Sequence, residues 1–196
     1  MRGNFQMNVT STSTYLIALG GNMPSVVGSP PKTLQSALER LDEMGGHVIA
    51  ISKFYQTPCF PVGAGPDYVN AAAKIQYAGD PWAFLAMLHD VETEFGRERV
   101  QRWGRRTLDL DLVAAGQDVV PNVETYVNWR DLSVENQMQE TPDQLILPHP
   151  RMQDRAFVLI PLLDIAADWR HPVLGRSVSE MTANLPEIAR NEVVAL

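Results

Sequence analysis

The chain has 196 residues, a formal net charge of -7 at pH 7 and a hydrophobic content of 45%. That length fits one globular domain, or one domain with an insertion, and the composition is ordinary for a folded core. The negative charge argues against general binding to nucleic acid or anionic membranes, since both require a basic surface over a large area. The single cysteine, Cys59, excludes an intramolecular disulfide and is typical of a reducing compartment.

The N-terminal segment is polar. The first 13 residues are rich in Ser, Thr and Asn and lack the basic and apolar regions of a signal peptide. No apolar run approaches the roughly 18 residues that a membrane-spanning helix needs. We therefore expect residues 1–13 to be a disordered tail, residues 14–196 to be a single domain, and the protein to be soluble and cytoplasmic.

Hydrophobic periods of two and of 3.6 residues alternate in the first half of the chain, which predicts a mixed strand-and-helix domain. Apolar or alternating runs predict strands over Tyr15–Leu19, His47–Gln56 and Tyr68–Tyr77, and helical spacing predicts helices over Thr33–Met44 and Pro81–Phe95. Gly20-Gly21-Asn22 is typical of a tight turn, and Pro58–Pro66 of a loop long enough to act as a lid.

The second half is less regular. A strand is predicted over Thr107–Leu112, and residues 121–144 form a polar insertion without a clear period. An apolar segment returns at Leu145–Leu147. A Pro-His-Pro turn at 148–150 follows it, and the fixed φ angles of its prolines would hold His149 rigidly. The last predicted elements are a helix over Arg155–Ala166 that Pro161 interrupts and a short terminal helix over Arg176–Leu185.

Two acids stand in the strand predicted over Thr107–Leu112. Leucines alternate with Asp109 and Asp111, so both carboxylates lie on one face. Carboxylates this close repel each other, and a divalent cation such as Mg²⁺ would relieve the repulsion while keeping positions open for phosphate oxygens. The alternative is a half-exposed strand with solvated acids.

A basic segment directly precedes these acids. Residues 97–106 hold five of the chain's 16 Lys and Arg residues in ten positions. Guanidinium groups bind phosphate through paired hydrogen bonds, so arginines beside a metal-binding pair suit a polyphosphate ligand. Trp103 and Gly104 indicate a loop that can close. The alternatives are a solvated basic face or arginines paired with Glu98 and nearby acids.

Four further polar residues are candidates on weaker grounds. Asn70 could hydrogen bond to the edge of a flat heterocycle and Tyr68 could stack on one, or Asn70 caps a turn and Tyr68 packs in the core. Glu92 lies near the basic segment, or is only a solvated helix acid. His149 is functional, or is structural as most single loop histidines are.

Six segments together resemble motifs of the 6-hydroxymethyl-7,8-dihydropterin pyrophosphokinase family, in the same order, over about residues 15 to 172. They are Gly20-Gly21-Asn22, Phe54–Pro58, Pro66–Ala71, Glu94–Arg97, Arg102–Asp111 and Pro148–Met152. The insertion and the two termini fall outside the resemblance.

The resemblance implies an α+β fold of the ferredoxin-like kind, an αβ sandwich in which helices cover one face of an antiparallel sheet, with an insertion near 121–144. It also implies a Mg²⁺-dependent reaction of folate biosynthesis. In that reaction the hydroxymethyl oxygen of the pterin attacks the β-phosphorus of ATP, receives pyrophosphate and releases AMP. The implied partners are the small molecules pterin and ATP, with no nucleic acid and no membrane. We expect a monofunctional monomer, with a dimer as the alternative.

The resemblance also implies roles for individual residues. Asp109 and Asp111 would hold two Mg²⁺ ions that bridge the phosphates. The other roles fall into three groups: charge stabilisation and loop closure at ATP by Arg97, Arg106 and Trp103; pterin binding by Thr57, Tyr68, Asn70 and Phe157; and nucleotide binding by Glu92, His149 and Arg155.

Some positions depart from the family pattern. Gly21 stands where the family usually has Ser, which we expect to be harmless in a turn, and Arg105 replaces a frequent Pro. At the positions of Gln144 and Ile146 some relatives have a basic residue and a Thr that contact ATP. We assign no ATP contact to Gln144 or Ile146. Two other functions stay open: a ferredoxin-like module that binds single-stranded RNA through the Arg and Trp residues, and a metal-dependent phosphohydrolase.

Overall fold

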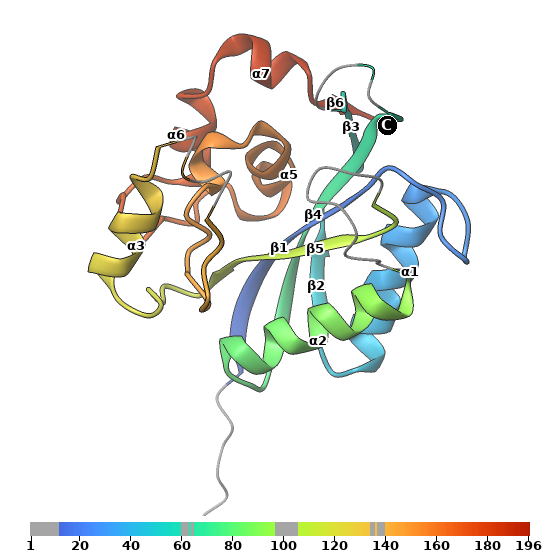
Figure 1. Cartoon of the computed structure of the whole chain (residues 1–196), viewed down its shortest axis with the longest axis horizontal. Helices are drawn as coiled ribbons and strands as arrows, with labels where there is room; N and C mark the ends of the chain where they lie inside the picture. The colour runs from blue at the N-terminus through green and yellow to red at the C-terminus, as the bar shows by residue number, and fades with distance from the viewer. Residues whose placement is uncertain (1–11, 60–62, 64, 97–105, 134–135, 137–139) are drawn as a thin grey trace, which may run out of the picture.

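The computed structural model describes residues 12–59, 63, 65–96, 106–133, 136 and 140–196 (Figure 1). Within these ranges no helix is both long and apolar enough to pass through a bilayer. The elements in chain order are β1 (Ser13–Gly21), α1 (Pro30–Glu43), β2 (His47–Ile51), β3 (Tyr55–Thr57), β4 (Tyr68–Tyr77), α2 (Pro81–Glu94), β5 (Asp109–Ala115), α3 (Val123–Arg130), the 3₁₀ turn η1 (Met152–Asp154), α5 (Ala156–Ala166), α6 (Val178–Ala183), α7 (Glu187–Asn191) and β6 (Val194–Ala195).

The strands form one antiparallel sheet. Their order is β5-β1-β4-β3-β6, and β2 pairs with β4 beside β3. The apolar run Tyr15–Leu19 forms the centre of β1, between β4 and β5, and all five of its residues are buried. β6 pairs with β3, so the C-terminus lies beside these strands in Figure 1.

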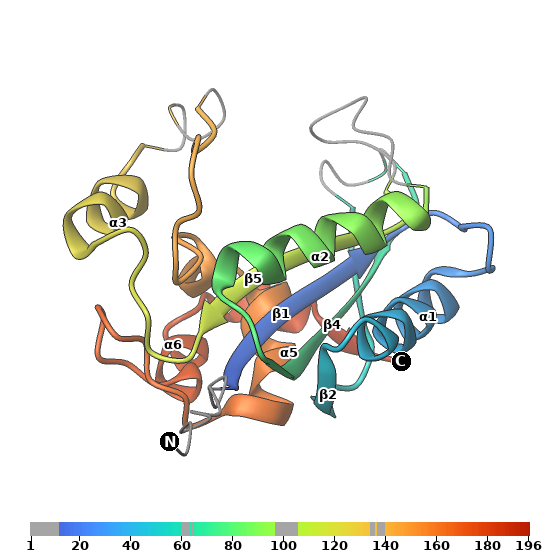
Figure 2. The same cartoon turned by 90° about the horizontal axis from the view of Figure 1, so that it is seen from below.

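Helices cover both faces of the sheet, so the expectation that they cover only one face is wrong. One face packs against α1 and α2, and the other packs against α5 and α6, as the two views show (Figures 1 and 2). Alternate residues of β1 supply both cores: Ile17 belongs to the first and Leu16 to the second. The physical reason is that a strand apolar at every position must be shielded from water on both sides.

The strand predicted over His47–Gln56 is two strands instead of one. Ser52 pairs with Ala72 through its backbone N–H at 2.9 Å and also accepts the Ala72 N–H on its hydroxyl at 2.8 Å. The next N–H, of Lys53, donates to the carboxylate of Asp164 on α5 at 3.0 Å. The chain therefore leaves the ladder at residues 52–54 and re-enters it as β3.

The C-terminal third also differs from the prediction. α5 continues through Pro161, because Leu159 and Leu162 on either side are fully buried and keep the helix packed on the sheet. The predicted terminal helix is shorter, as α6, where Ser177 and Glu180 form a capping box. α7 and β6 follow it and had no periodic signal of their own.

The insertion contains a helix, α3, which begins where Asn122 accepts a hydrogen bond from the Thr125 N–H at 2.9 Å. Tyr126 is fully buried, and its hydroxyl hydrogen bonds to Nε2 of His171 at 2.9 Å. This contact fastens α3 to the segment before α6, away from α1 and α2 (Figure 2).

Candidate active site

The polar candidates gather at one end of the sheet, on the face that α5 covers. The register places Asp109, Gly20, Asn70 and Tyr55 side by side across β5, β1, β4 and β3. Gly20 forms the middle of this row, where a Cβ atom would approach Asn70 Oδ1 to 3.2 Å. The absence of a side chain at Gly20 leaves room between the acid and the amide.

The two acids lie as the alternation predicts. Asp109 and Asp111 share the α5 face of β5, whereas Leu110 and Leu112 are buried in the α1 and α2 core. The side chain of Asp109 is 17% exposed and that of Asp111 is 41% exposed. The strand itself is shifted from the predicted range, because it begins at Asp109 and continues to Ala115.

An arginine faces each acid. Arg106 forms an ion pair with Asp109, and Arg155 Nη1 lies 4.0 Å from Asp111 Oδ2. Burial lowers the pKa of Arg155, which nevertheless stays cationic at neutral pH, and the charge on Asp111 acts in the opposite direction. The guanidinium carbon of Arg155 also lies 5.7 Å from the ring centroid of Phe157, so this ring borders the acid pair.

His149 is held against the end of β5. Its backbone N–H donates to the Val113 carbonyl at 2.8 Å, and its Nδ1 accepts the Arg151 N–H at 3.0 Å. Burial lowers the pKa of His149 to about 3, and the cations Arg155 and Arg151 act in the same direction. The imidazole is therefore neutral at physiological pH with its proton on Nε2, which suits a hydrogen-bond donor.

The amide side of the site is preorganised. Asn70 and Thr57 are both buried, and Asn70 Nδ2 donates to Thr57 Oγ1 at 2.8 Å. Asn70 is within β4, so the alternative that it caps a turn is excluded. Tyr68 is opposite Thr57 in the ladder, and its pKa is raised by burial, with Arg106 and Asp109 among the charges that act on it. The phenol of Tyr68 therefore lies near the acid side of the site.

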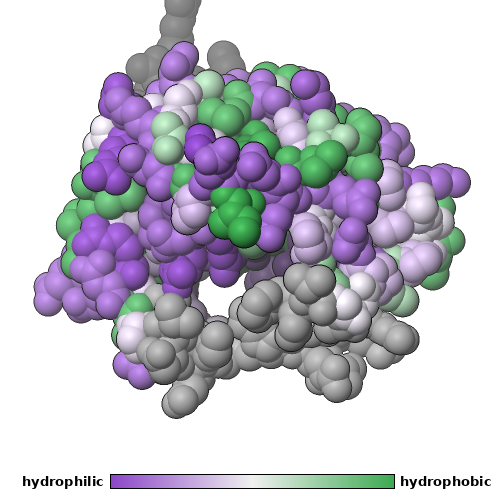
Figure 3. Space-filling view, turned by 90° about the horizontal axis from the view of Figure 1, so that it is seen from above, coloured by the Kyte–Doolittle hydropathy of each residue, from purple (hydrophilic) through white to green (hydrophobic). Residues whose placement is uncertain are grey.

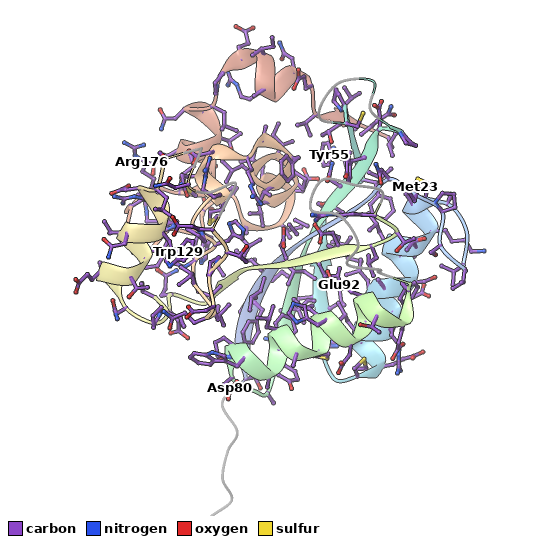
Figure 4. The ribbon with its side chains drawn as sticks, viewed as in Figure 1. Met23, Tyr55, Asp80, Glu92, Trp129 and Arg176 are labelled. Atoms are coloured by element: carbon purple, nitrogen blue, oxygen red, sulfur yellow. The ribbon has the colours of Figure 1, made fainter. Side chains whose placement is uncertain are left out.

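Glu92 is not a solvated helix acid. It is 1% exposed on α2, and its Oε1 accepts the N–H of Leu110 at 2.7 Å. Figure 4 shows this side chain between α2 and β5. Leu110 separates the two aspartates, so Glu92 supports the strand that carries them, while its expected role in binding the nucleotide stays a prediction.

Two predicted site residues, Arg97 and Trp103, lie outside the described residues, as do Arg99, Arg102 and Arg105. Cys59 is buried and makes polar contacts. Its thiol donates to the Gly65 carbonyl at 3.0 Å and accepts the Gly65 N–H at 3.3 Å, which closes the loop before β4.

Sequence reasoning treated Gly20-Gly21-Asn22 as turn chemistry, and that interpretation is wrong. Gly20 and Gly21 are the last residues of β1, and Asn22 is a buried amide after it. A Cβ on Gly21 would lie 2.6 Å from the Thr107 carbonyl oxygen, so glycine suits this backbone, in keeping with the expectation that its replacement of the usual Ser is harmless. The paired glycines were a visible signal of close backbone approach, but their partner strand was not.

The donor set of the acid pair fits Mg²⁺. Carboxylates are the hard oxygen ligands that Mg²⁺ prefers, and one or two of them suffice when phosphate oxygens complete the coordination. Within the described ranges, no group of three or more His, Cys, Asp or Glu side chains forms a candidate metal cage. Arg106 and Arg155 beside Asp109 and Asp111 supply the cations that a polyphosphate requires.

These features define a protein of mixed helices and antiparallel strands in which two acids and two arginines lie beside a buried amide and hydroxyl. Comparison with known proteins narrows that class. The model of the family described as 7,8-dihydro-6-hydroxymethylpterin-pyrophosphokinase matches residues 16–167. The chain belongs to this family, and it is thus a pyrophosphokinase of folate synthesis.

Individual relatives support this family assignment. The chain is 35% identical over 156 residues to the 2-amino-4-hydroxy-6-hydroxymethyldihydropteridine pyrophosphokinase of Haemophilus influenzae, covering 79% of this chain and 82% of the relative. It is 35% identical over 173 residues to the Pseudomonas aeruginosa protein of the same name, covering 87% and 90%. The crystal structure of wild-type Plasmodium falciparum HPPK-DHPS has a similar fold, with a TM-score of 0.64 and 14% identity over 88% of this chain and 41% of that chain.

Proposed function

We propose that the chain transfers pyrophosphate from ATP to the hydroxymethyl group of 6-hydroxymethyl-7,8-dihydropterin, with Asp109 and Asp111 as ligands of two Mg²⁺ ions. The observation that carries the proposal is the row of Asp109, Gly20 and Asn70 across one end of the sheet. It brings the acid pair, which could hold Mg²⁺ against phosphate, next to a polar pair suited to the edge of a heterocycle.

In the proposed reaction the pterin hydroxymethyl oxygen forms a bond to the β-phosphorus and its proton is released to solvent. The bond between that phosphorus and the bridging oxygen of the α-phosphate breaks, and AMP leaves with the bridging electrons. Mg²⁺ bound at the two carboxylates would neutralise phosphate charge and align an in-line displacement. Arg106 stands next to Asp109 and can stabilise the charge that develops as the bridge breaks. Arg155, on the side of Asp111, binds the phosphates as a fixed cation.

The pterin would lie on the amide side of the site. Asn70 and Thr57 are buried and already hydrogen bonded to each other, so they can hydrogen bond to the polar edge of the ring with little reorganisation. Tyr68 and Phe157 are proposed to contact its two faces, and Phe157 is exposed to 39% at the start of α5, where a ligand can reach it. His149 would donate a hydrogen bond from Nε2 to the nucleotide. Glu92 would either bind the nucleotide or act indirectly by supporting β5.

The remaining proposals concern residues and properties outside the described contacts. Arg97 is proposed to stabilise charge at ATP and Trp103 to close over it, as the family resemblance implies.

The order β5-β1-β4-β2 with α1 and α2 on one face supports a ferredoxin-like core, to which α5 and α6 add a second layer. We propose a single domain over residues 14–196 that acts as a cytoplasmic monomer. Figure 3 shows one face of the molecule, which is largely hydrophilic and on which hydrophobic residues form separate areas.

The test is a product assay. The chain is incubated with ATP, MgCl₂ and 6-hydroxymethyl-7,8-dihydropterin, and the nucleotide products are separated. AMP formed in equal amount to pyrophosphorylated pterin, and lost on chelation with EDTA, is the expected result. Formation of ADP, or phosphate release without pterin, would contradict the proposal and favour a different phosphoryl-transfer reaction.

A further inference from the structure

Asn22, directly after β1, uses both ends of its side-chain amide. Its Oδ1 accepts the backbone N–H of Arg106 at 2.9 Å, and its Nδ2 donates to the Pro66 carbonyl at 3.2 Å. The backbone N–H groups of Asn22 and Met23 also donate to the Arg106 carbonyl, at 2.9 and 3.1 Å. Asn22 is 6% exposed, so water competes little for these bonds. One buried amide thus joins two segments that are far apart in the sequence.

Each segment leads to one half of the proposed site. On one side, Arg106 forms the ion pair with Asp109. On the other, Pro66 lies two residues before Tyr68, the first residue of β4. Figure 4 labels Met23, the residue after Asn22, at this end of β1 beside α1. The Asn22 side chain therefore links the phosphate side and the pterin side of the site directly, in addition to the backbone bonds to Arg106 and the pairing of β1 with β4 and β5.

We propose that Asn22 is a positioning residue that aligns the pterin hydroxymethyl oxygen with the β-phosphorus of ATP by holding Pro66 and Arg106 at a fixed spacing. This inference rests on the proposed function. A misplacement of reacting atoms by about 1 Å can cost roughly 10²-fold in rate, so a small shift of either segment is sufficient. Thr57, Asn70, Asp109 and Asp111 are on strands and keep their positions without Asn22. Binding of each substrate is consequently affected less than turnover.

The chemistry of the amide makes the role specific. Asp at this position keeps the acceptor for the Arg106 N–H but loses the donor to Pro66 and places a carboxylate against a carbonyl oxygen. Ala loses both bonds. Turnover per folded molecule is therefore expected to fall in both variants, whereas a general loss of folded protein would leave it unchanged.

The experiment compares Asn22→Ala, Asn22→Asp and the wild-type chain in the AMP-release assay at 25 °C, with ATP saturating and pterin varied, then the reverse. We expect kcat of Asn22→Ala to fall about tenfold or more while both KM values change less than about threefold. Thermal unfolding of each variant gives the folded fraction used to normalise kcat. Asn184→Asp is the matched control, because Asn184 Nδ2 also donates to a backbone carbonyl, that of Glu180 at 2.8 Å, at an exposed position in another layer.

The outcomes separate this inference from the proposed function. An inactive wild-type chain contradicts the proposed function itself. An active wild type with unchanged kcat in Asn22→Ala, even if that variant melts earlier, overturns the positioning role and leaves Asn22 purely structural. An Asn22→Asp variant as fast as the wild type would overturn the two-sided role, because the bond to Pro66 would then contribute nothing.

Discussion

The two faces of the sheet are built from the same strands but are used differently. Tyr15, Ile17 and Leu19 of β1 face α1 and α2 and pack into a continuous apolar core. The other face of β1 carries Leu16 and Ala18 under α5 and then Gly20, where the polar row begins. The first face is covered along the whole strand, and the second is packed at one end and polar at the other. This asymmetry explains why the site can carry unfavourable charges: the opposite core stabilises the strands that hold them.

The comparison predicts the largest effect for the acids at the polar end. Asp109→Ala and Asp111→Ala should each lower turnover by roughly 10³-fold or more, because charge stabilisation at the phosphates is lost. Stability should change by only about 1 kcal/mol, since loss of the partly exposed ion pair is offset by relief of repulsion between the acids. Activity assays and thermal unfolding check both statements.

A matched control for the acids is Asp118→Ala, which removes an exposed acid from the turn at the other end of β5. It should leave turnover unchanged. A large fall in melting temperature for either site variant would mean that the acids serve the fold instead of the phosphates.

The next effect tests the packed face. Leu38→Ala on α1 removes a side chain that is 2% exposed, and it should cost about 3 kcal/mol of unfolding free energy through lost burial and a cavity. Activity per folded molecule should stay within about twofold, since α1 lies on the face opposite the site. Urea unfolding measures the first quantity, with Ile188→Ala, at 72% exposed, as the surface control. A variant as stable as the wild type would contradict the packing of α1 on the sheet.

Substitutions at Gly20 and Gly21, the last two residues of β1, test the point where the apolar core and the polar row meet. Gly21→Ala should destabilise by about 2 kcal/mol and slow turnover, because its Cβ would lie 2.6 Å from the Thr107 carbonyl oxygen, between Arg106 and Asp109 in sequence. Gly20→Ala meets only the Asn70 side chain, at 3.2 Å, and should chiefly raise KM for the pterin. The two variants are compared by thermal unfolding and by KM; equal effects on both quantities would argue against this difference between the faces.

The smallest predicted effect concerns pH. Among the described residues the one fully buried histidine is His171, whose pKa burial lowers from 6.5 to about 4. The unfolded chain takes up this proton below about pH 6.5 but the folded chain does so only near pH 4, so stability falls as pH drops through that window. Between pH 7 and pH 5 the loss due to His171 should be on the order of 1–2 kcal/mol, and His149, whose pKa is lowered to about 3, adds to the loss in the same direction.

The measurement is the melting temperature of wild type and His171→Phe at a series of pH values. His171→Phe loses the hydrogen bond to Tyr126 and should be less stable at pH 7, but its pH dependence in this window should be weaker. An equally steep dependence in the variant would assign the effect to other groups.

Much of the molecule could be predicted from local patterns. The alternation in residues 107–112 placed Asp109 and Asp111 on one face because side chains alternate along any strand, whatever the partner strands are. Helix α2 begins at Pro81, as predicted, and the Asp80 side chain caps it by accepting the Ala83 N–H at 2.8 Å, since capping depends on neighbours in the sequence. The order of the six motifs indicated the family before any contact was known.

Tertiary structure decided the contacts between segments distant in the chain. The break between β2 and β3 depends on Asp164 of α5, and the site itself depends on a register that brings Gly20 between Asp109 and Asn70. No local period encodes these partners, because each is chosen by packing on both sides of the sheet. The sequence by itself determined which residues are candidates for the chemistry. The tertiary structure decided that Glu92 supports β5 and that Asn22 hydrogen bonds to both Arg106 and Pro66, since buried hydrogen bonds between distant segments exist only once the sheet has formed.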